Sequence, residues 1–437
     1  MSFIFLMHSF ALSIIKTRGS LHNNKRQKGI NIFIMTTEQK TLITATVPIL
    51  KENGVLLTKY FYNRMFTHHP ELKNMFNMGN QQSGKQQTAL AMAVLAYAEH
   101  IADPTVLLPV VDRIGQKHIS LDIRPEQYII VGRHLIASIQ EVLGDAATPE
   151  IVDAWTAAYN QLAKLMSGHE ANLYEQQTNR TNGWTGWRPF KVGKKVTESA
   201  EITSFYLYPA DGGKVTPHQP GQFISIRLFL PQLNLKQARQ YSVSSTPGHE
   251  YYRISVKREK GSNLDTSGMI SNQLHDFINE NDIVDLTAPA GNFTLTPNID
   301  APVTLISGGV GITPLLSMLH SLVENDYAHP ITWLHGCRDQ SVHAFRNQLN
   351  DIVKTKSNVK QHVFYNQVTD ENREAGVLEG YLDISKVPSL NLQPDAHYFI
   401  CGPSAFIQKQ HHDLVSAGVN KQHIYFEEFG PQLLSLN

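Results

Sequence analysis

Two kinds of hydrophobic pattern divide the chain near residue 170. Between Met35 and about Glu170, apolar residues recur at spacings of three and four, the period of an amphipathic helix, and strand patterns are few. Two such stripes consist of Leu107, Val110, Val111, Ile114 and His118, and of Gln86, Leu90, Val94, Tyr97 and Ile101. The pattern predicts an all-helical first domain.

Short strands separated by turn residues come next along the chain. Residues 202–208, 222–230 and 252–257 alternate or run apolar, and Pro220-Gly221 and Pro247-Gly248 interrupt them. Strands of this length with such punctuation are typical of an antiparallel barrel.

Strands and helices alternate in the last third. Residues 301–307, 331–335 and 397–400 are predicted strands, and residues 315–322 and 404–414 are predicted helices. This alternation predicts a parallel sheet whose ligand lies at the carboxyl ends of the strands.

Two turns in this region carry candidate chemistry. The first places bare backbone NH groups at a helix N-terminus, where a dinucleotide pyrophosphate can bind, although such turns also occur without a ligand. It consists of Gly308, Gly309, Val310, Gly311, Ile312, Thr313 and Pro314. The second is Cys401-Gly402-Pro403. Cys401 is expected to contact a nicotinamide, and a small buried hydrophobe is the alternative.

A polar run opens one strand of the predicted barrel: Arg239, Gln240, Tyr241 and Ser242. An arginine there can clamp a diphosphate, a tyrosine can lie against a flat ring, and a serine hydroxyl can donate to a ring nitrogen. Singly, each residue also has an ordinary structural explanation.

Together with Glu427, Phe429 and Gly430 near the chain end, these motifs resemble the ferredoxin-NADP reductase superfamily. The resemblance implies that the residues from Arg239 to Ser242 hold FAD and that Phe223 contacts its adenosine side, although a phenylalanine in the core of a strand explains Phe223 equally well. It also implies that Phe429 lies over the flavin ring where the nicotinamide enters. The matching phosphate-binding turn consists of Gly268, Met269, Ile270 and Ser271, and the loop before it, residues 261–267, is longer than the family leads us to expect.

The helical domain is similar to a globin. Tyr62, an aromatic corner at Phe76, Gln86 with Leu90 one turn later, and His118 occur in globin order. A globin fused to a flavin reductase is the arrangement of the flavohaemoglobins, and the resemblance runs from about Met35 to the chain end.

This resemblance implies a role for each of these positions. His118 is expected to bind the iron of haem b, although a histidine on an apolar stripe is more often a satisfied core residue. Phe76 packs on the porphyrin, Tyr62 and Gln86 face the distal side, and Leu90 restricts that side.

Tyr128 and Glu170 match positions that hydrogen-bond around the proximal histidine. A carboxylate accepting from His118 makes the imidazole more electron-rich, which favours oxygen activation over oxygen carriage.

The implied activity is that of a nitric oxide dioxygenase. NADH or NADPH reduces FAD, the flavin passes single electrons to haem, and oxygen bound to the ferrous haem converts nitric oxide to nitrate. Lys117 and Glu427 match residues at the junction of haem and flavin, and a solvated lysine and a solvated glutamate are the alternative.

Three other functions stay open at this point. One is an oxygen carrier or sensor whose reductase keeps the iron ferrous, which would be favoured if Glu170 did not reach His118. Another is a flavin reductase with a haem-free helical domain, and the third is reduction of small acceptors such as quinones. The choice between NADH and NADPH is also open, although Arg338 could pair with a 2′-phosphate.

Composition limits the partners. The 437-residue chain has 38 Lys and Arg against 38 Asp and Glu, so charge gives no argument for nucleic acid or anionic membrane. With 2 cysteines it predicts no disulfide framework, which suits a reducing cytoplasm. We expect a monomer without integral membrane association.

The expected domains are a globin at residues 35–170, a linker at 171–187, an FAD barrel at 188–297 and an NAD(P) domain at 298–437. Residues 1–34 match nothing in the family. Their apolar stretch, residues 3–15, is shorter than the about 20 residues that a spanning helix requires. We expect a start-codon artefact or a disordered extension.

Overall fold

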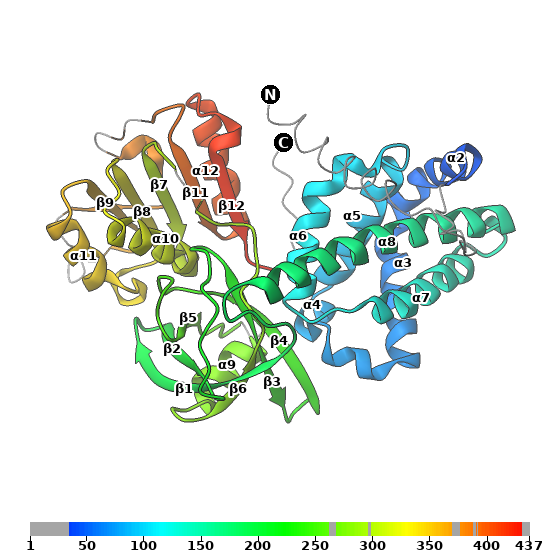
Figure 1. The fold of residues 1–437 in the computed structure, drawn as a ribbon. Coiled ribbons are helices and arrows are strands. Elements are labelled where there is room, and N and C mark those ends of the chain that lie inside the picture. The colour runs from blue at the N-terminus through cyan, green and yellow to red at the C-terminus, as the bar shows by residue number, and fades with distance from the viewer. Residues whose placement is uncertain are drawn as a thin grey trace, which may run out of the picture. The chain divides into compact units, whose positions relative to one another are not determined.

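The computed structural model describes residues 35–261, 268–295, 299–368, 376–387, 390 and 392–430. The predicted extension at 1–34 and residues 262–267 of the predicted long loop lie outside this range. Along the chain, helices are followed by two sheets (Figure 1), the order that the hydrophobic pattern predicts. Among the described residues, no helix has the length and apolar character needed to cross a membrane.

The first part of the described chain is helical, as predicted. Its α-helices are α2 (Thr37–Ala45), α3 (Val47–His68), α4 (Met78–Gln82), α5 (Lys85–Glu99), α6 (Leu108–Ile119), α7 (Pro125–Leu143) and α8 (Pro149–Asn179). Helices α3, α6, α7 and α8 have a proline in their first turn, where the missing NH removes no helical hydrogen bond. Ile101 and Leu107 lie just outside the helices predicted to contain them, although both pack in the helical core.

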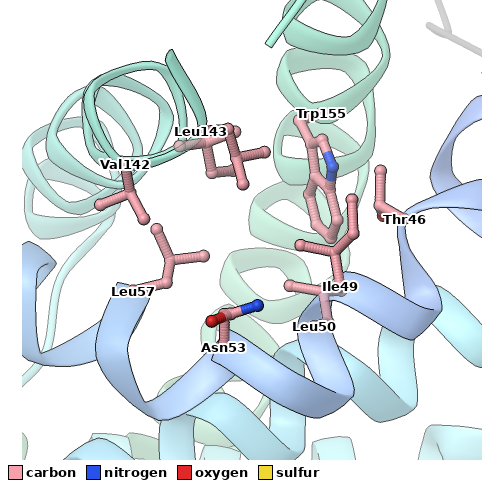
Figure 2. A pocket seen from close by; sticks show the side chains of 9 residues that line it. Thr46, Ile49, Leu50, Asn53, Leu57, Val142, Leu143 and Trp155 are labelled. Carbon is pink, nitrogen blue, oxygen red and sulfur yellow. The ribbon is translucent and has the colours of Figure 1, made fainter. Parts of the chain in front are cut away.

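The helical core is well filled. Phe61, Met65, Tyr97, Ile139 and Trp155 are buried in it. Figure 2 shows a cavity between α3, α7 and α8 that Trp155 faces, with a volume of about 20 Å³. That is space for about one water molecule, so this cavity is not a cofactor site.

Helix α8 is longer than predicted. It runs to Asn179, so the first part of the segment predicted as linker, from residue 171, is helical. The polar composition around Gln176 was misleading, because Leu173, Tyr174 and Gln177 are buried at helical spacing after Met166 and Glu170. The domain boundaries themselves stay predictions.

The second part is an antiparallel sheet of strands β1 (Arg188–Thr197), β2 (Ile202–Pro209), β3 (Phe223–Leu230), β4 (Leu235–Ser242), β5 (Tyr252–Lys257) and β6 (Ile283–Leu286). Its order is β4-β3-β6-β1-β2-β5. The outer strands meet beyond Ser242, where Val243 bridges Ile254 and the Ser244 NH donates to the Arg253 carbonyl at 2.7 Å. The sheet therefore closes into the predicted barrel, and α9 (Met269–Phe277) packs Ile270 and Leu274 into its core.

The third part is a parallel sheet of order β10-β9-β8-β7-β11-β12. Its strands are β7 (Val303–Gly308), β8 (Ile331–Cys337), β9 (Val359–Tyr365), β10 (Val377–Glu379), β11 (His397–Gly402) and β12 (Ile424–Glu428), and its helices are α10 (Ile312–Glu324), α11 (Arg346–Thr355) and α12 (Ser404–Ser416). Cys401 and Gly402, predicted as a turn, are the last residues of β11, where they pair with neighbouring strands. Only Pro403 remains as the connection to α12.

Candidate functional site

One cluster of the site joins α6, α7 and α8. The Glu170 carboxylate lies 2.7 Å from Nδ1 of His118 and accepts from the Tyr128 hydroxyl at 2.6 Å. The Tyr128 oxygen is also 3.0 Å from the same Nδ1. Glu170 is only 2 % exposed, so both interactions are shielded from water. The three residues that the sequence predicted to act together therefore do meet.

Two glycines let the helices approach closely enough for this contact. A Cβ on Gly115 of α6 would come within 2.8 Å of the His169 ring of α8. A Cβ on Gly132 of α7 would come within 2.2 Å of the Tyr159 ring, whose hydroxyl donates to the Tyr128 carbonyl at 2.5 Å. A side chain at either glycine would therefore displace the ring of His169 or Tyr159, both of which belong to α8.

The protonation state of Tyr128 follows from its surroundings. Burial raises the pKa of Tyr128, and the charge of Glu170 beside it raises the pKa further. The phenol therefore stays protonated and donates to the carboxylate. With Nδ1 of His118 held by these partners, Nε2 is the ring nitrogen left to bind a ligand.

A second cluster surrounds Tyr62 on α3. Tyr62 is 4 % exposed, and its ring centroid is 5.9 Å from that of Phe66 and 5.7 Å from that of Phe76. Burial raises the pKa of Tyr62 to about 12, while the amides of Gln86 and Gln81, which face its hydroxyl, act in the opposite direction. The hydroxyl is thus a protonated donor in an apolar setting.

The amide of Gln81 is incompletely satisfied. Nε2 of Gln87 donates to Oε1 of Gln81 at 2.9 Å, whereas Nε2 of Gln81 is buried and, although it faces the Tyr62 hydroxyl, makes no hydrogen bond of normal geometry within the described chain. An unpaired buried donor costs about 1–3 kcal/mol unless a ligand accepts from it. Phe76 and Leu90 pack nearby against the helical core and keep this region apolar.

The barrel strand β4 carries the predicted flavin residues in register with β3. Ser242 pairs with Phe223, Tyr241 with Ile224, and Arg239 with Ile226. Burial lowers the pKa of Arg239 to about 10. Within the described chain, the guanidinium makes one hydrogen bond, to the Ala238 carbonyl. A cation in a partly dry site without a carboxylate partner suits a bound anion such as a diphosphate.

The start of α9 offers a second anion-binding feature. Gly268 is its N-cap and provides no side-chain cap, so the first NH groups of the helix are available. A Cβ on Gly268 would lie 2.4 Å from Oγ of Ser271, which folds back to donate to the Gly268 carbonyl at 3.1 Å. Met269 and Ile270 form the first turn, and Ile270 is buried.

Phe223 contacts the helical part of the chain. It lies against an apolar cluster that contains Ile119, Leu173 and Tyr174 of the helical part together with Ala290. Gly291, at φ +106°, would bring a Cβ within 2.8 Å of the Phe223 ring. The predicted contact of Phe223 with the flavin adenosine stays a prediction.

Hydrogen bonds link the barrel to the helix that carries His118. Nε2 of Gln240 donates to Oγ of Ser120 at 2.8 Å, and Oγ1 of Thr287 donates to the Ser120 carbonyl at 3.0 Å. The Gly291 NH donates to the Gln116 side chain at 3.0 Å. Strand β4, which is predicted to hold the flavin, is therefore hydrogen-bonded to Ser120, two residues after the predicted haem ligand His118.

Lys117 contacts the end of the described chain. Its Nζ donates to the Gly430 carbonyl at 2.8 Å, and Glu427 and Glu428 oppose the lowering of its pKa that burial causes. Phe429, between them and Gly430, is 44 % exposed. The charge of Glu427 therefore acts on Lys117, while the place of both residues at a haem–flavin junction stays a prediction.

The glycine turn that follows β7 packs directly against the end of β11. A Cβ on Gly311 would lie 2.1 Å from the Cys401 carbonyl oxygen, and one on Gly402 would lie 2.8 Å from the Phe406 ring. Gly309 has φ +54°, a conformation that favours glycine. Burial raises the pKa of the Cys401 thiol, so it is a neutral group at the strand end. Ile312, Thr313 and Pro314 are buried in the first turn of α10, whereas Val310 is only partly buried.

Arg338 is already paired. It lies 2.9 Å from Glu201 and 3.2 Å from Asp339. A 2′-phosphate would have to compete with these two carboxylates, which weakens the argument for NADPH from this residue.

Sequence reasoning missed Gln81, Ser120 and Gln237. Ser120 and Gln237 act through contacts between segments far apart in sequence, Gln81 bonds to Gln87 in the next helix, and each is a common polar residue with no motif around it. Only the position of Ser120, two residues after His118, was a usable signal.

Comparison with known proteins agrees with this architecture. Residues 59–166 match the globin family, and residues 305–412 match the oxidoreductase NAD-binding domain family. The flavohemoprotein of Bordetella parapertussis is 51 % identical over 401 residues, covering 91 % of this chain and 99 % of that protein. The flavohemoprotein of Rhizobium meliloti is 46 % identical over 404 residues, covering 92 % and 100 %.

Solved structures give the same result. A flavohemoglobin from Malassezia yamatoensis with bound FAD and heme has a TM-score of 0.80 at 29 % identity, covering 90 % of this chain and 99 % of that one. The FAD/NAD-binding domain of a nitric oxide dioxygenase from Vibrio cholerae has a TM-score of 0.52 at 37 % identity, covering 56 % and 99 %.

The fold and site define a haem- and flavin-dependent NAD(P)H oxidoreductase. The chain belongs to the flavohaemoglobin family. Its cofactors are haem, FAD and NAD(P)H. The residues described above fit these groups, because Nε2 of His118, the Gln81 amide and the Arg239 guanidinium are polar groups left for a ligand.

Proposed function

We propose that this protein is a nitric oxide dioxygenase that uses NADH or NADPH, oxygen and nitric oxide and releases nitrate. The observation that carries the proposal is the buried contact of Glu170 with His118. A globin that only carries oxygen has little use for a carboxylate behind its proximal histidine. The nitric oxide dioxygenase of Vibrio cholerae, similar over the reductase part, supports the same activity.

The bound groups would supply hydride acceptance, single-electron transfer and oxygen binding. The protein's own residues would set the conditions. His118 would bind the iron through Nε2, with Glu170 and Tyr128 fixing its ring. Tyr62 and Gln86 would donate to the negative charge that develops on the distal side, Phe76 would pack on the porphyrin, and Leu90 would narrow access.

The residues of the reductase part would bind and orient the flavin and the nicotinamide. Arg239 and the α9 N-terminus at Gly268–Ser271 would hold the diphosphate, while Tyr241 and Ser242 would orient the ring system. The turn from Gly308 to Pro314 would bind the nucleotide pyrophosphate. Cys401 and Phe429 would lie at the nicotinamide, and Lys117 with Glu427 would align the haem and flavin parts.

The carrier hypothesis would have been favoured if Glu170 did not reach His118, and the 2.7 Å distance argues against it. A haem-free helical domain is opposed by the relative from Malassezia yamatoensis, which contains heme. No observation in the described chain favours either over the dioxygenase.

The variant Tyr62→Phe tests the proposal. It removes one donor from a buried site, and a hydrogen bond to a charged group contributes about 1.5–3 kcal/mol, so nitric oxide consumption should slow by about 10- to 100-fold. Reduction of the flavin by NADH should be unchanged in stopped-flow traces. Tyr60→Phe is the matched control, because Tyr60 lies on the same helix but is 42 % exposed and bonds Glu141. Equal turnover of the Tyr62 variant and wild type would refute the assignment.

A further inference from the structure

The segment between η1 (Pro70–Asn74) and the end of α4 is anchored on the flavin strand. Oε1 of Gln237, in β4, accepts from the Met78 NH at 3.0 Å, and its Nε2 donates to the Lys73 carbonyl at 2.8 Å. Gln237 is fully buried. The neighbouring Lys236 NH donates to the Asn74 side chain at 2.8 Å. One buried glutamine therefore fixes both ends of a short loop that begins α4.

The same segment carries groups of the distal cluster. Phe76 lies between the two anchored residues and packs on Tyr62. Gln81 is near the end of α4, and Gln87 holds both its carbonyl, at 3.1 Å, and its Oε1, at 2.9 Å. Because Oε1 is occupied, the Gln81 amide nitrogen is the end left free beside Tyr62.

Helix α4 also touches the predicted diphosphate site. A Cβ on Gly79 would lie 3.4 Å from Cε of Met269 and 3.7 Å from Nη2 of Arg239, so the helix backbone packs directly against both residues. Helix α4 has five residues, too few to be stable by itself. Its position therefore depends on these contacts with the barrel.

We propose that Gln237 is a positioning residue for the distal side of the haem: it holds α4 so that the Gln81 amide points at the ligand beside Tyr62. The barrel thereby sets ligand retention in the globin part. This inference rests on haem binding and on the family's distal pocket, and it does not require that nitric oxide be the substrate.

The test is the holoprotein variant Gln237→Leu. Loss of the bond to the Met78 NH should speed amide exchange across residues 78–82 by about tenfold, the equivalent of one hydrogen bond. With carbon monoxide as probe on the reduced protein, the C–O stretching frequency should rise, because a distal donor is withdrawn. Oxygen release should be about three- to tenfold faster. FAD content and flavin reduction by NADH should match wild type.

Two further variants separate this role from general loosening. Thr287→Val removes another bond between barrel and helices, the one to the Ser120 carbonyl, and should leave the C–O frequency at its wild-type value. Gln81→Leu should reproduce the frequency shift of Gln237→Leu without changing exchange at Met78. The proposal is overturned if Gln237→Leu speeds exchange in α4 but leaves the C–O frequency unchanged, or if Thr287→Val shifts it equally.

If Gln237→Leu does not load haem, Gln237→Glu decides the matter. The carboxylate still accepts from the Met78 NH but cannot donate to the Lys73 carbonyl, so a smaller shift in the same direction is expected. No shift in this variant overturns the proposal. None of these readouts involves nitric oxide, so the outcome is independent of the proposed dioxygenase activity.

Discussion

Replacing Glu170 by Gln isolates the effect of one buried charge on the proximal side. The amide has the same size as the carboxylate, and its oxygen can still accept at the position of Oε1. That atom receives bonds from His118 at 2.7 Å and from Tyr128 at 2.6 Å. The substitution therefore removes the charge and leaves the packing in place.

The magnitude follows from those two bonds. Hydrogen bonds to a charged group contribute about 1.5–3 kcal/mol each, against about 0.5–1.5 kcal/mol for neutral ones. Loss of the charge thus weakens the two hydrogen bonds to Glu170 by about 2–3 kcal/mol in total. Mutating a residue that hydrogen-bonds to a metal ligand changes activity by about 10- to 100-fold, which is the same range.

The assay is a redox titration of the haem together with steady-state nitric oxide consumption. A less electron-rich imidazole stabilises ferric iron less, so the midpoint potential of Glu170→Gln should be more positive and turnover should fall by about 10- to 100-fold. Glu175→Gln, on the exposed face of the same helix, is the matched control and should behave as wild type. A Glu170→Gln protein with wild-type potential and turnover would show that the reasoning about axial basicity is wrong.

Three other predictions concern the haem, the nucleotide turn and pH. His118→Ala should give a protein with flavin absorbance but no stable haem, and a normal haem spectrum would disprove the ligand assignment. Gly311→Ala should abolish flavin reduction by NADH while haem content stays normal, because the new Cβ would lie 2.1 Å from the Cys401 carbonyl; wild-type reduction in stopped flow would contradict this. Burial lowers the pKa of His218 to about 4, so between pH 6.5 and 4 the unfolded chain binds the proton and the folded one does not. The free energy of unfolding should therefore fall as pH drops through that window, by up to about 1.4 kcal/mol per pH unit for this group, and urea titrations of His218→Gln should show a shallower dependence.

The fold was largely predictable because hydrophobic period is a local property. Spacing of three and four located the helices, and short apolar runs with Pro-Gly breaks located the barrel strands. Helix α8 is the exception. Its end beyond Glu170 is polar in composition, and only tertiary burial of Leu173, Tyr174 and Gln177 shows why it continues.

The cluster of His118, Tyr128 and Glu170 could be predicted from the sequence, because each of the three residues matches a family position. The anchoring of α4 was not. Gln237 bonds to Met78, 159 residues away, and Gln81 bonds to Gln87 in the next helix, and no spacing rule marks such pairs. Phe223 also packs against an apolar cluster that contains Ile119 and Tyr174, and no motif encodes that contact.

The most direct test of the dioxygenase function is the amount of nitrate formed per nitric oxide consumed by the purified holoprotein, with oxygen and either NADH or NADPH. We predict about one nitrate per nitric oxide with at least one of the two nucleotides, and no nitrate when oxygen is removed. Nitric oxide consumption without nitrate, or no consumption above that of the His118→Ala variant, would contradict the proposed function.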